Sequence, residues 1–152
     1  MYQFLIVDDE AIEREGVSFL IRKFSYPFRV FIQNNGKNAL DFLRENPVDI
    51  LCTDIKMPFM DGLGLCAEAK KLYPDICLLL LTAYSDFDYA KRAIQVRADE
   101  YLLKPVVPGE FQTVIQKLLD RLDSRREEEE RRRSLISQFK NGDEDFLLHL
   151  GN

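Results

Sequence analysis

Four short apolar segments of this sequence each end in acidic, hydroxyl or amino side chains. These side chains are Asp8, Asp9 and Glu10 after the first segment, Asp54 after the second, Thr82 after the third, and Lys104 with Pro105 after the fourth. Crowded carboxylates repel one another and resist ionisation unless a cation neutralises them, and their oxygens suit a hard ion such as Mg²⁺. If the segment ends meet, Asp54 could attack phosphorus in line while the metal, Thr82 and Lys104 compensate the charge of the transition state.

Each of these residues taken alone has an ordinary structural explanation. A run such as Asp8–Glu10 favours the start of a helix through the helix dipole. Asp54, followed by Met57-Pro58, would be a turn residue in many proteins, and Thr82 and Lys104 would be loop residues. The chemical interpretation therefore depends on their joint placement at successive segment ends.

Over the first 105 residues, short β-rich segments alternate with helical patterns. The predicted strands are residues 2–7, 28–33, 49–53, 76–81 and 100–103. This alternation is typical of a parallel sheet covered by helices on both faces. Ligands of such sheets bind beyond the carboxyl ends of the strands, so the polar residues are expected to converge on one edge. The pattern does not give the strand order.

Apolar residues at helical spacing mark the connections between these strands. In the first connection, the stripe expected to face the core comprises Ile12, Gly16, Phe19, Leu20 and Phe24. Further helices are predicted after the Asn35-Gly36 turn, from a cap at Asp61 to about Tyr73, from a capping box at Ser85 and Asp88, and from Phe111 to Leu122.

Composition sets limits on the class of protein. The chain has 152 residues, of which 46% are hydrophobic, enough for one domain with a full core and a modest appendage. A net charge of −5 and a pI near 5.0 disfavour nucleic-acid binding by this chain alone. No apolar run reaches the roughly 18 residues that a membrane helix needs. The three cysteines lack the spacing of a zinc site, so we expect buried, reduced thiols and a cytoplasmic protein.

The sequence changes character after Leu122. Residues 123–133 (DSRREEEERRR) contain almost nothing apolar, and Glu and Arg at three- and four-residue separations support an exposed helix. We therefore predict a charged helical linker, because a coiled coil would place Glu129 in its seam. An apolar tail without a core of its own comes next, with Leu135, Ile136, Phe139, Phe146, Leu147, Leu148 and Leu150.

The segments VDDE, DIKMPFMDG, LLTAYSD and YLLKP resemble those of the CheY-like receiver domains of two-component response regulators. The likeness covers residues 1–122, which would be the receiver, and leaves 123–152 as the linker and tail. It implies an α/β fold of flavodoxin-like type, a doubly wound, five-stranded parallel sheet with five helices, here extended by a C-terminal helical segment.

The resemblance also assigns a role to each residue of the predicted site. Asp54 would be the phosphorylated aspartate; Asp9, Asp54 and the backbone carbonyl of Lys56 would ligate Mg²⁺, with Asp8 supporting the ion through water. Lys104 would pair with a phosphoryl oxygen, Thr82 would hydrogen-bond the phosphorylated state, and Lys104-Pro105 would be joined by a cis peptide bond.

Other residues would carry the switch and tune it. Tyr101 stands at the place of the family's switch aromatic, although it could simply be a half-buried strand tyrosine. Lys56 and Tyr84 would shield the acyl phosphate and set its lifetime. Arg97 occupies a place where receivers commonly have glycine, and a left-handed helix end there would cost about 1 kcal/mol. We therefore expect the usual cap to be absent and the fourth helix to be looser.

The segments AYSDFDYAKRAI and DEYLLKPV are similar to receivers of AraC-type transcriptional response regulators. This likeness implies a helical linker and a C-terminal DNA-binding domain, which would be missing from this chain. The phosphoryl donor would be the phosphohistidine of a sensor histidine kinase; the lone His149 is expected to be a surface or interface residue. A homodimer would form through the face of the fourth helix, fifth strand and fifth helix, or through the C-terminal helix.

Three alternatives remain at the level of sequence. A stand-alone receiver acting by protein contacts would need a self-contained C-terminus, which the apolar tail argues against. A small phosphotransferase or phosphatase would need a cap or a substrate-specific insertion, and every connection is short. A flavin-binding electron carrier would need a hydroxyl-rich phosphate loop after the first strand. We expect a switch that phosphorylates and dephosphorylates itself, rather than an enzyme.

Overall fold

A computed structural model describes residues 1–83 and 97–141 of the protein. The chain divides into two units, residues 1–115 and residues 116–152. Within the described residues, no helix has the length and apolar character needed to cross a membrane.

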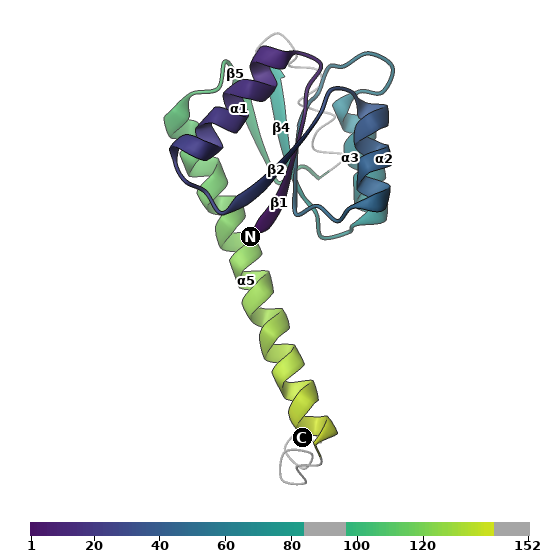
Figure 1. Ribbon diagram of the computed structural model, residues 1–152, viewed down its shortest axis with the longest axis vertical. Coiled ribbons are helices and arrows are strands. Elements are labelled where there is room, and N and C mark those ends of the chain that lie inside the picture. The colour runs from purple at the N-terminus through teal and green to yellow at the C-terminus, as the bar shows by residue number, and fades with distance from the viewer. Residues whose placement is uncertain (84–96, 142–152) are drawn as a thin grey trace. The chain divides into compact units, whose positions relative to one another are not determined.

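The first unit is built on a five-stranded parallel sheet (Figure 1). Its strands are β1 (Tyr2–Val7), β2 (Phe28–Gln33), β3 (Ile50–Asp54), β4 (Cys77–Ala83) and β5 (Glu100–Lys104), and their order is β2-β1-β3-β4-β5. That order is the flavodoxin-like one, so the predicted fold class is confirmed. All five residues of β3 are buried, and so are the first six of β4, as apolar central strands of a parallel sheet require.

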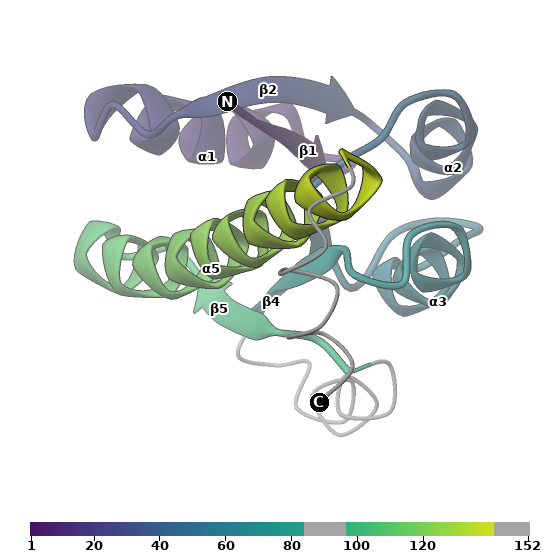
Figure 2. The same cartoon turned by 90° about the horizontal axis from the view of Figure 1, so that it is seen from below.

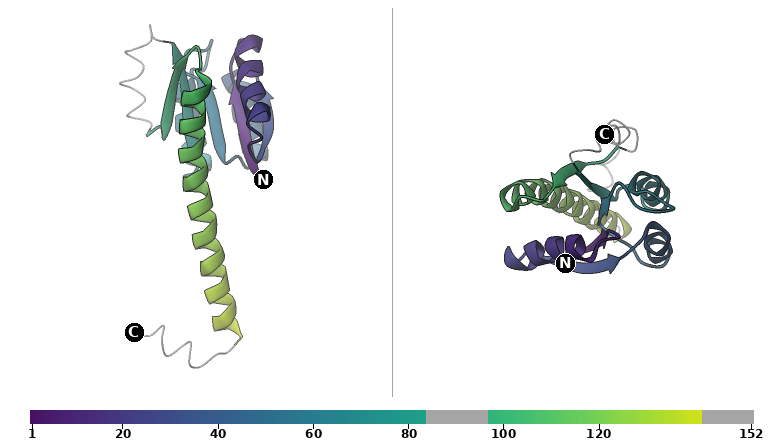
Figure 3. Two further views of the ribbon diagram at one scale, coloured as in Figure 1. Left: turned by 90° about the vertical axis from the view of Figure 1, so that its left-hand side faces the viewer. Right: turned by 90° about the horizontal axis from the view of Figure 1, so that it is seen from above.

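Helices cover both faces of this sheet. They are α1 (Ala11–Lys23), α2 (Gly36–Glu45), α3 (Gly62–Leu72) and α5 (Pro108–Lys140). Figure 2 shows α1 and the beginning of α5 on one face and α2 with α3 on the other. The view from the opposite end gives the same layers, with α1 in purple and α2 and α3 in blue and teal (Figure 3).

Local signals begin two of these helices where they were expected. The Asn35 side chain accepts a hydrogen bond from the backbone N–H of Asn38 at 2.7 Å, and the Asp61 side chain accepts one from Gly64 at 2.8 Å. Each bond satisfies a donor that the first turn of a helix leaves free. Asp61 thus fixes the start of α3 directly after the loop that leaves β3.

The expected core face of α1 was right for Leu20 and wrong for Ile12 and Phe19. The buried residues of this helix are Val17, Ser18, Leu20 and Ile21, whereas Ile12 is 78% and Phe19 is 54% exposed. The predicted stripe was rotated by about 100°, the turn of one residue, from the true one. Apolar residues lie on both sides of α1, so helical spacing alone fits two overlapping faces.

Arg97 also departs from expectation. Its φ is 56°, so the backbone adopts the left-handed conformation that we expected to be absent without glycine. The cost of about 1 kcal/mol is outweighed by the strand pairing that this conformation allows, because Asp99 donates its backbone N–H to Leu78 and enters β5 beside β4. The predicted fourth helix, between Ser85 and Arg97, lies outside the described residues, which contain four helices.

The α5 helix changes along its length. Its buried side chains are Phe111, Val114, Ile115, Leu118, Leu119 and Leu122. From Asp123 to Asn141 the side chains are exposed, apart from a half-exposed Arg125. Ion pairs within the helix join Arg133 to Glu129 at 2.9 Å and Arg126 to Glu130 at 3.7 Å. Such pairs support an exposed helix, as the sequence pattern of this stretch suggested.

Candidate functional site

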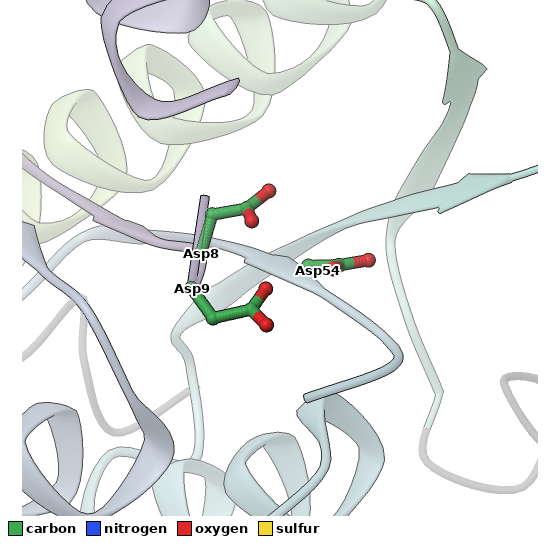
Figure 4. A group of neighbouring side chains, drawn as sticks. All are labelled: Asp8, Asp9 and Asp54. Carbon is green, nitrogen blue, oxygen red and sulfur yellow. The ribbon is translucent and has the colours of Figure 1, made fainter. Parts of the chain in front are cut away.

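The carboxyl ends of β1, β3 and β5 bring four of the predicted site residues together. Asp8 and Asp9 come directly after β1, Asp54 ends β3, and Lys104 ends β5. Figure 4 shows the three carboxylates gathered about a common space, and one oxygen from each lies within 4.8 Å of the others. Asp8 is fully buried and Asp54 is 8% exposed, whereas Asp9 is exposed.

Lys104 is the cation that faces these carboxylates. Its Nζ lies 2.9 Å from Oδ2 of Asp8 and 3.3 Å from Oδ2 of Asp54. Burial lowers the pKa of Lys104, but the hydrogen bond to Asp8 and the charges of Asp54, Asp8 and Glu13 outweigh burial and raise it. The ammonium therefore stays charged in the site and holds the two carboxylates together.

Asp54 is the carboxyl whose protonation the site changes most. Burial raises its pKa to about 6, with a further rise from the Asp8 charge, while Lys104 and a hydrogen bond from the backbone of Lys56 oppose the rise. One ammonium does not fully compensate the neighbouring carboxylates. The site thus favours additional positive charge next to Asp54.

Asp8 is fixed by the backbone around it. Its Oδ1 accepts the backbone N–H of Glu10 at 3.0 Å, and its own carbonyl accepts a hydrogen bond from Nη1 of Arg14 at 2.8 Å. With Oδ2 held by Lys104, both oxygens of this carboxylate already have protein partners. Sequence reasoning missed Arg14, because its role depends on how the first turn of α1 folds over the end of β1.

Gly62 is a second residue that sequence reasoning missed. Its N–H donates to the carbonyl of Ile55 at 2.7 Å, and a Cβ at this position would lie 2.0 Å from the carbonyl oxygen of Asp54. Only glycine allows the loop after β3 to return this close to its own start. The signal was present as the glycine directly after the Asp61 cap.

The other predicted site residues differ in how far they are buried. Thr82 is buried in β4, and its hydroxyl donates to the carbonyl of Ala83 at 3.2 Å. Tyr101 is 64% exposed, Lys56 is exposed, and the bond between Lys104 and Pro105 is cis. Tyr84 lies outside the described residues.

An open cavity of about 410 Å³ gives access to the Asp54 carboxylate. Its lining residues are Glu10, Glu13, Asp54, Lys56, Ala83, Lys104 and Pro105. A small phosphorylated group fits this space, which both Asp54 and Lys104 line. Glu13, from α1, is a third residue that sequence reasoning did not place here.

Comparison with known proteins decides the family. Residues 4–116 match the family described as "Response regulator receiver domain". The chain belongs to this family. The matched range is nearly the whole of the first structural unit, so the site described above is that of a receiver.

Several individual proteins are similar to this receiver. The receiver domain of AraT, a response regulator from Geobacillus stearothermophilus, is 37% identical, with a TM-score of 0.76 over 82% of this chain and 98% of that one. A two-component transcriptional regulator AraC from Clostridium phytofermentans is 30% identical, with a TM-score of 0.74 over 84% and 99%. The transcriptional regulatory protein HptR of Staphylococcus aureus is 32% identical over 78% of this chain and 47% of its own length. The chain thus spans about half the length of HptR.

The acidic cluster of the receiver fits a magnesium ion by both chemistry and spacing. Mg²⁺ takes oxygen ligands at 2.0–2.1 Å, so two ligand oxygens on opposite sides of one ion lie about 4.2 Å apart. Asp8, Asp9 and Asp54 hold oxygens within 4.8 Å of one another, close enough for small side-chain shifts to complete such a site. The raised pKa of Asp54 points the same way, because a cation would lower it again.

Proposed function

We propose that this chain is a phosphoacceptor switch, in which Asp54 accepts a phosphoryl group from the phosphohistidine of a sensor histidine kinase. One observation carries the proposal: the almost buried Asp54 carboxylate lines an open cavity, 3.3 Å from the Lys104 ammonium and beside two further carboxylates. Membership of the receiver family supports the same chemistry.

Phosphorylation in this proposal is an in-line displacement. An oxygen of Asp54 attacks phosphorus, the bond from phosphorus to the imidazole nitrogen breaks, and its electron pair stays on that nitrogen. Lys104 then turns from the Asp54 carboxylate to an oxygen of the phosphoryl group, which keeps its positive charge beside the new negative charge. The Asp54 carboxylate lines the open cavity, so a donor can reach it from solvent.

Magnesium would be held by Asp9, Asp54 and the backbone carbonyl of Lys56, with Asp8 acting through water. Bound there, the ion supplies positive charge against the phosphoryl oxygens. Both oxygens of Asp8 have protein partners, Glu10 and Lys104, which supports the indirect role. Asp9 is exposed, and its carboxylate would serve as a direct ligand.

The switch in this proposal joins Thr82 and Tyr101. To reach a phosphoryl oxygen, the Thr82 hydroxyl must leave the Ala83 carbonyl, 3.2 Å away. Tyr101 is 64% exposed, an outward position from which it can turn inward when Thr82 moves. Lys56, at the cavity, would tune the lifetime of the phosphate together with Tyr84. Phosphorylation would shift the balance between two such arrangements rather than create a new one.

The proposed output is transcriptional control. Similarity to HptR and to the AraC regulator supports this direction, and HptR is about twice as long as the matched region. A DNA-binding domain beyond the receiver would carry the contact with nucleic acid, and a homodimer would form through the switch face or the C-terminal helix. Because the aspartate is consumed rather than turned over rapidly, the chain acts as a switch and not as an enzyme.

Intact mass tests the proposal directly. The protein is incubated with acetyl phosphate, with and without Mg²⁺, as wild type and as Asp54→Asn; Asp41→Asn, which changes an exposed carboxylate on α2, is the matched control. We expect one Mg²⁺-dependent phosphate on the wild type and on the control, and none on Asp54→Asn. Equal incorporation by Asp54→Asn would overturn the assignment of the phosphoacceptor.

A further inference from the structure

The lining of the Asp54 cavity contains two carboxylates, Glu10 and Glu13, that the proposed phosphorylation does not use. Glu10 and Glu13 both line the cavity from the start of α1, in addition to the carboxylates that surround the proposed metal site. Neither is among the three residues whose oxygens cluster as possible metal ligands. An incoming phosphoryl donor, which is an anion, therefore enters a cavity lined by two negative side chains that have no direct part in the proposed displacement.

The positive charges of the cavity do not cancel these two. Lys104 is held between Asp8 and Asp54, with its Nζ 2.9 Å from Asp8 and 3.3 Å from Asp54. Lys56 is the other cationic residue in the lining, and its side chain is exposed. Two lysines thus face Asp54, Glu10 and Glu13 of the lining together with the Asp8 carboxylate.

We infer that Glu10 and Glu13 select the phosphoryl donor by its charge, so that donors linked through a protonated nitrogen are accepted more readily than acyl phosphates. This inference rests on the proposed function and deepens it by naming the class of donor. Acetyl phosphate is a dianion near neutral pH, whereas phosphoramidate carries a protonated nitrogen and is a monoanion. A phosphohistidine with a protonated ring has the same lower charge as phosphoramidate.

The two small donors isolate the charge because they deliver the same group to the same atom. With acetyl phosphate, the bond from phosphorus to oxygen breaks and acetate leaves with the electron pair. With phosphoramidate, the bond from phosphorus to nitrogen breaks and ammonia leaves, its nitrogen already protonated. Effects on Asp54, on Lys104 or on the metal are common to both reactions. The ratio of the two rates therefore reports the response to donor charge.

The expected size is given by Coulomb's law. One unit charge in the lining of a hydrated cavity changes a rate by about threefold to tenfold for each unit charge on the donor, at low ionic strength. Removal of the Glu13 charge is thus expected to raise the acetyl phosphate rate twice as strongly, on a logarithmic scale, as the phosphoramidate rate. The ratio of the rates would rise by about threefold to tenfold.

The experiment measures initial phosphorylation rates with both donors at saturating Mg²⁺, for the wild type, Glu13→Gln, Glu10→Gln and the double variant. Glu15→Gln is the matched control, because Glu15 is an exposed residue of the same helix that does not line the cavity. We expect the ratio of acetyl phosphate to phosphoramidate rates to rise in each single variant, to rise further in the double variant, and to stay unchanged in Glu15→Gln. The increases should shrink as salt is added.

The contrary outcomes are distinct. If Glu13→Gln changes both rates by the same factor, the residue acts through Lys104 and the inference on donor charge is wrong. An unchanged ratio in all variants would overturn it as well. If the wild type takes up phosphate from neither donor, the proposed function itself fails, and the inference fails with it.

Discussion

At the scale of single residues, the charged form of Asp54 is both the proposed nucleophile and a source of instability, because burial disfavours its charge. Its pKa in the folded protein is about 6, above its ordinary value of 3.8. A carboxyl with a raised pKa takes up a proton on folding between these two values. The stability of the metal-free protein is therefore highest below about pH 4 with respect to this group, and falls as the pH rises to about 6.

The first prediction concerns the loss of folding stability that the charged Asp54 causes. Asp54→Asn removes the charge and should stabilise the metal-free protein at pH 7.5 by about 1–3 kcal/mol more than at pH 4. The measurement is the free energy of unfolding by urea at both pH values, with Asp41→Asn as the control for an exposed carboxylate. A difference between wild type and Asp54→Asn that does not depend on pH would show that Asp54 is not electrostatically strained.

Gly62 gives the second prediction. In Gly62→Ala the new Cβ would meet the carbonyl oxygen of Asp54, so the loop must move, and we expect a loss of at least about 3 kcal/mol of stability together with slower phosphorylation. Gly16→Ala is the matched control, because nothing lies within 4 Å of a Cβ there and alanine favours the helix by about 0.5–1 kcal/mol. Equal effects of the two changes on the unfolding midpoint would contradict the close approach at Gly62.

The candidate site shows where sequence reasoning stops at this scale. The sequence predicts that Asp8, Asp54 and Lys104 lie close together, because residues at the carboxyl ends of parallel strands share one edge of the sheet. Arg14 and Glu13 could not be placed, because their positions depend on how α1 packs over that edge. The Thr82 hydroxyl was expected to face the phosphate, and its bond to Ala83 depends on a side-chain rotation that no spacing encodes.

At the scale of elements, α1 shows that helical periodicity does not by itself name the buried face. Apolar residues occur on both sides of this helix, and only packing against the sheet separates them. Strands were easier to predict, because a run that is apolar throughout, such as β3 or β4, can only be central. At Arg97 the local residue type predicts the wrong conformation. The chain enters β5 through a left-handed backbone conformation that a residue other than glycine disfavours.

The third prediction tests the corrected face of α1. Phe19 and Leu20 are neighbours, yet Phe19 is 54% exposed and Leu20 is 7% exposed. Leu20→Ala should cost about 2–4 kcal/mol of unfolding free energy, whereas Phe19→Ala should cost less than about 1 kcal/mol although it removes more atoms. Chemical denaturation of both variants gives the comparison. A larger cost at Phe19 would contradict the exposed position of this side chain.

At the scale of the whole molecule, the chain joins a receiver to a charged helix. Leu122 is the last buried side chain among the described residues of α5. The sequence predicts that the receiver ends at this residue, because apolar residues at helical spacing stop there, whereas the two structural units divide between residues 115 and 116. The segment to which the helix leads could not be derived from the charge pattern, since an exposed helix is compatible with many neighbours.

The fourth prediction concerns this distribution of buried side chains. A chain that ends at Leu122 should keep the stability of the full chain within about 1 kcal/mol, because the described residues removed are exposed or half-exposed. It should also take up phosphate at the same rate. Thermal unfolding and intact mass of the two chains provide the test, and a large loss of stability would move the boundary into the charged helix.

The proposed switch depends on the conversion of Asp54 to an acyl phosphate, and locating the modified residue is the sharpest test of it. Borohydride reduces an aspartyl phosphate to homoserine, which peptide mass mapping can assign to one position. After treatment with phosphoramidate and Mg²⁺, we expect homoserine at position 54 alone, and none when Mg²⁺ is withheld. Homoserine at position 8 or 9, or a phosphate that borohydride does not convert, would show that Asp54 is not the phosphoacceptor.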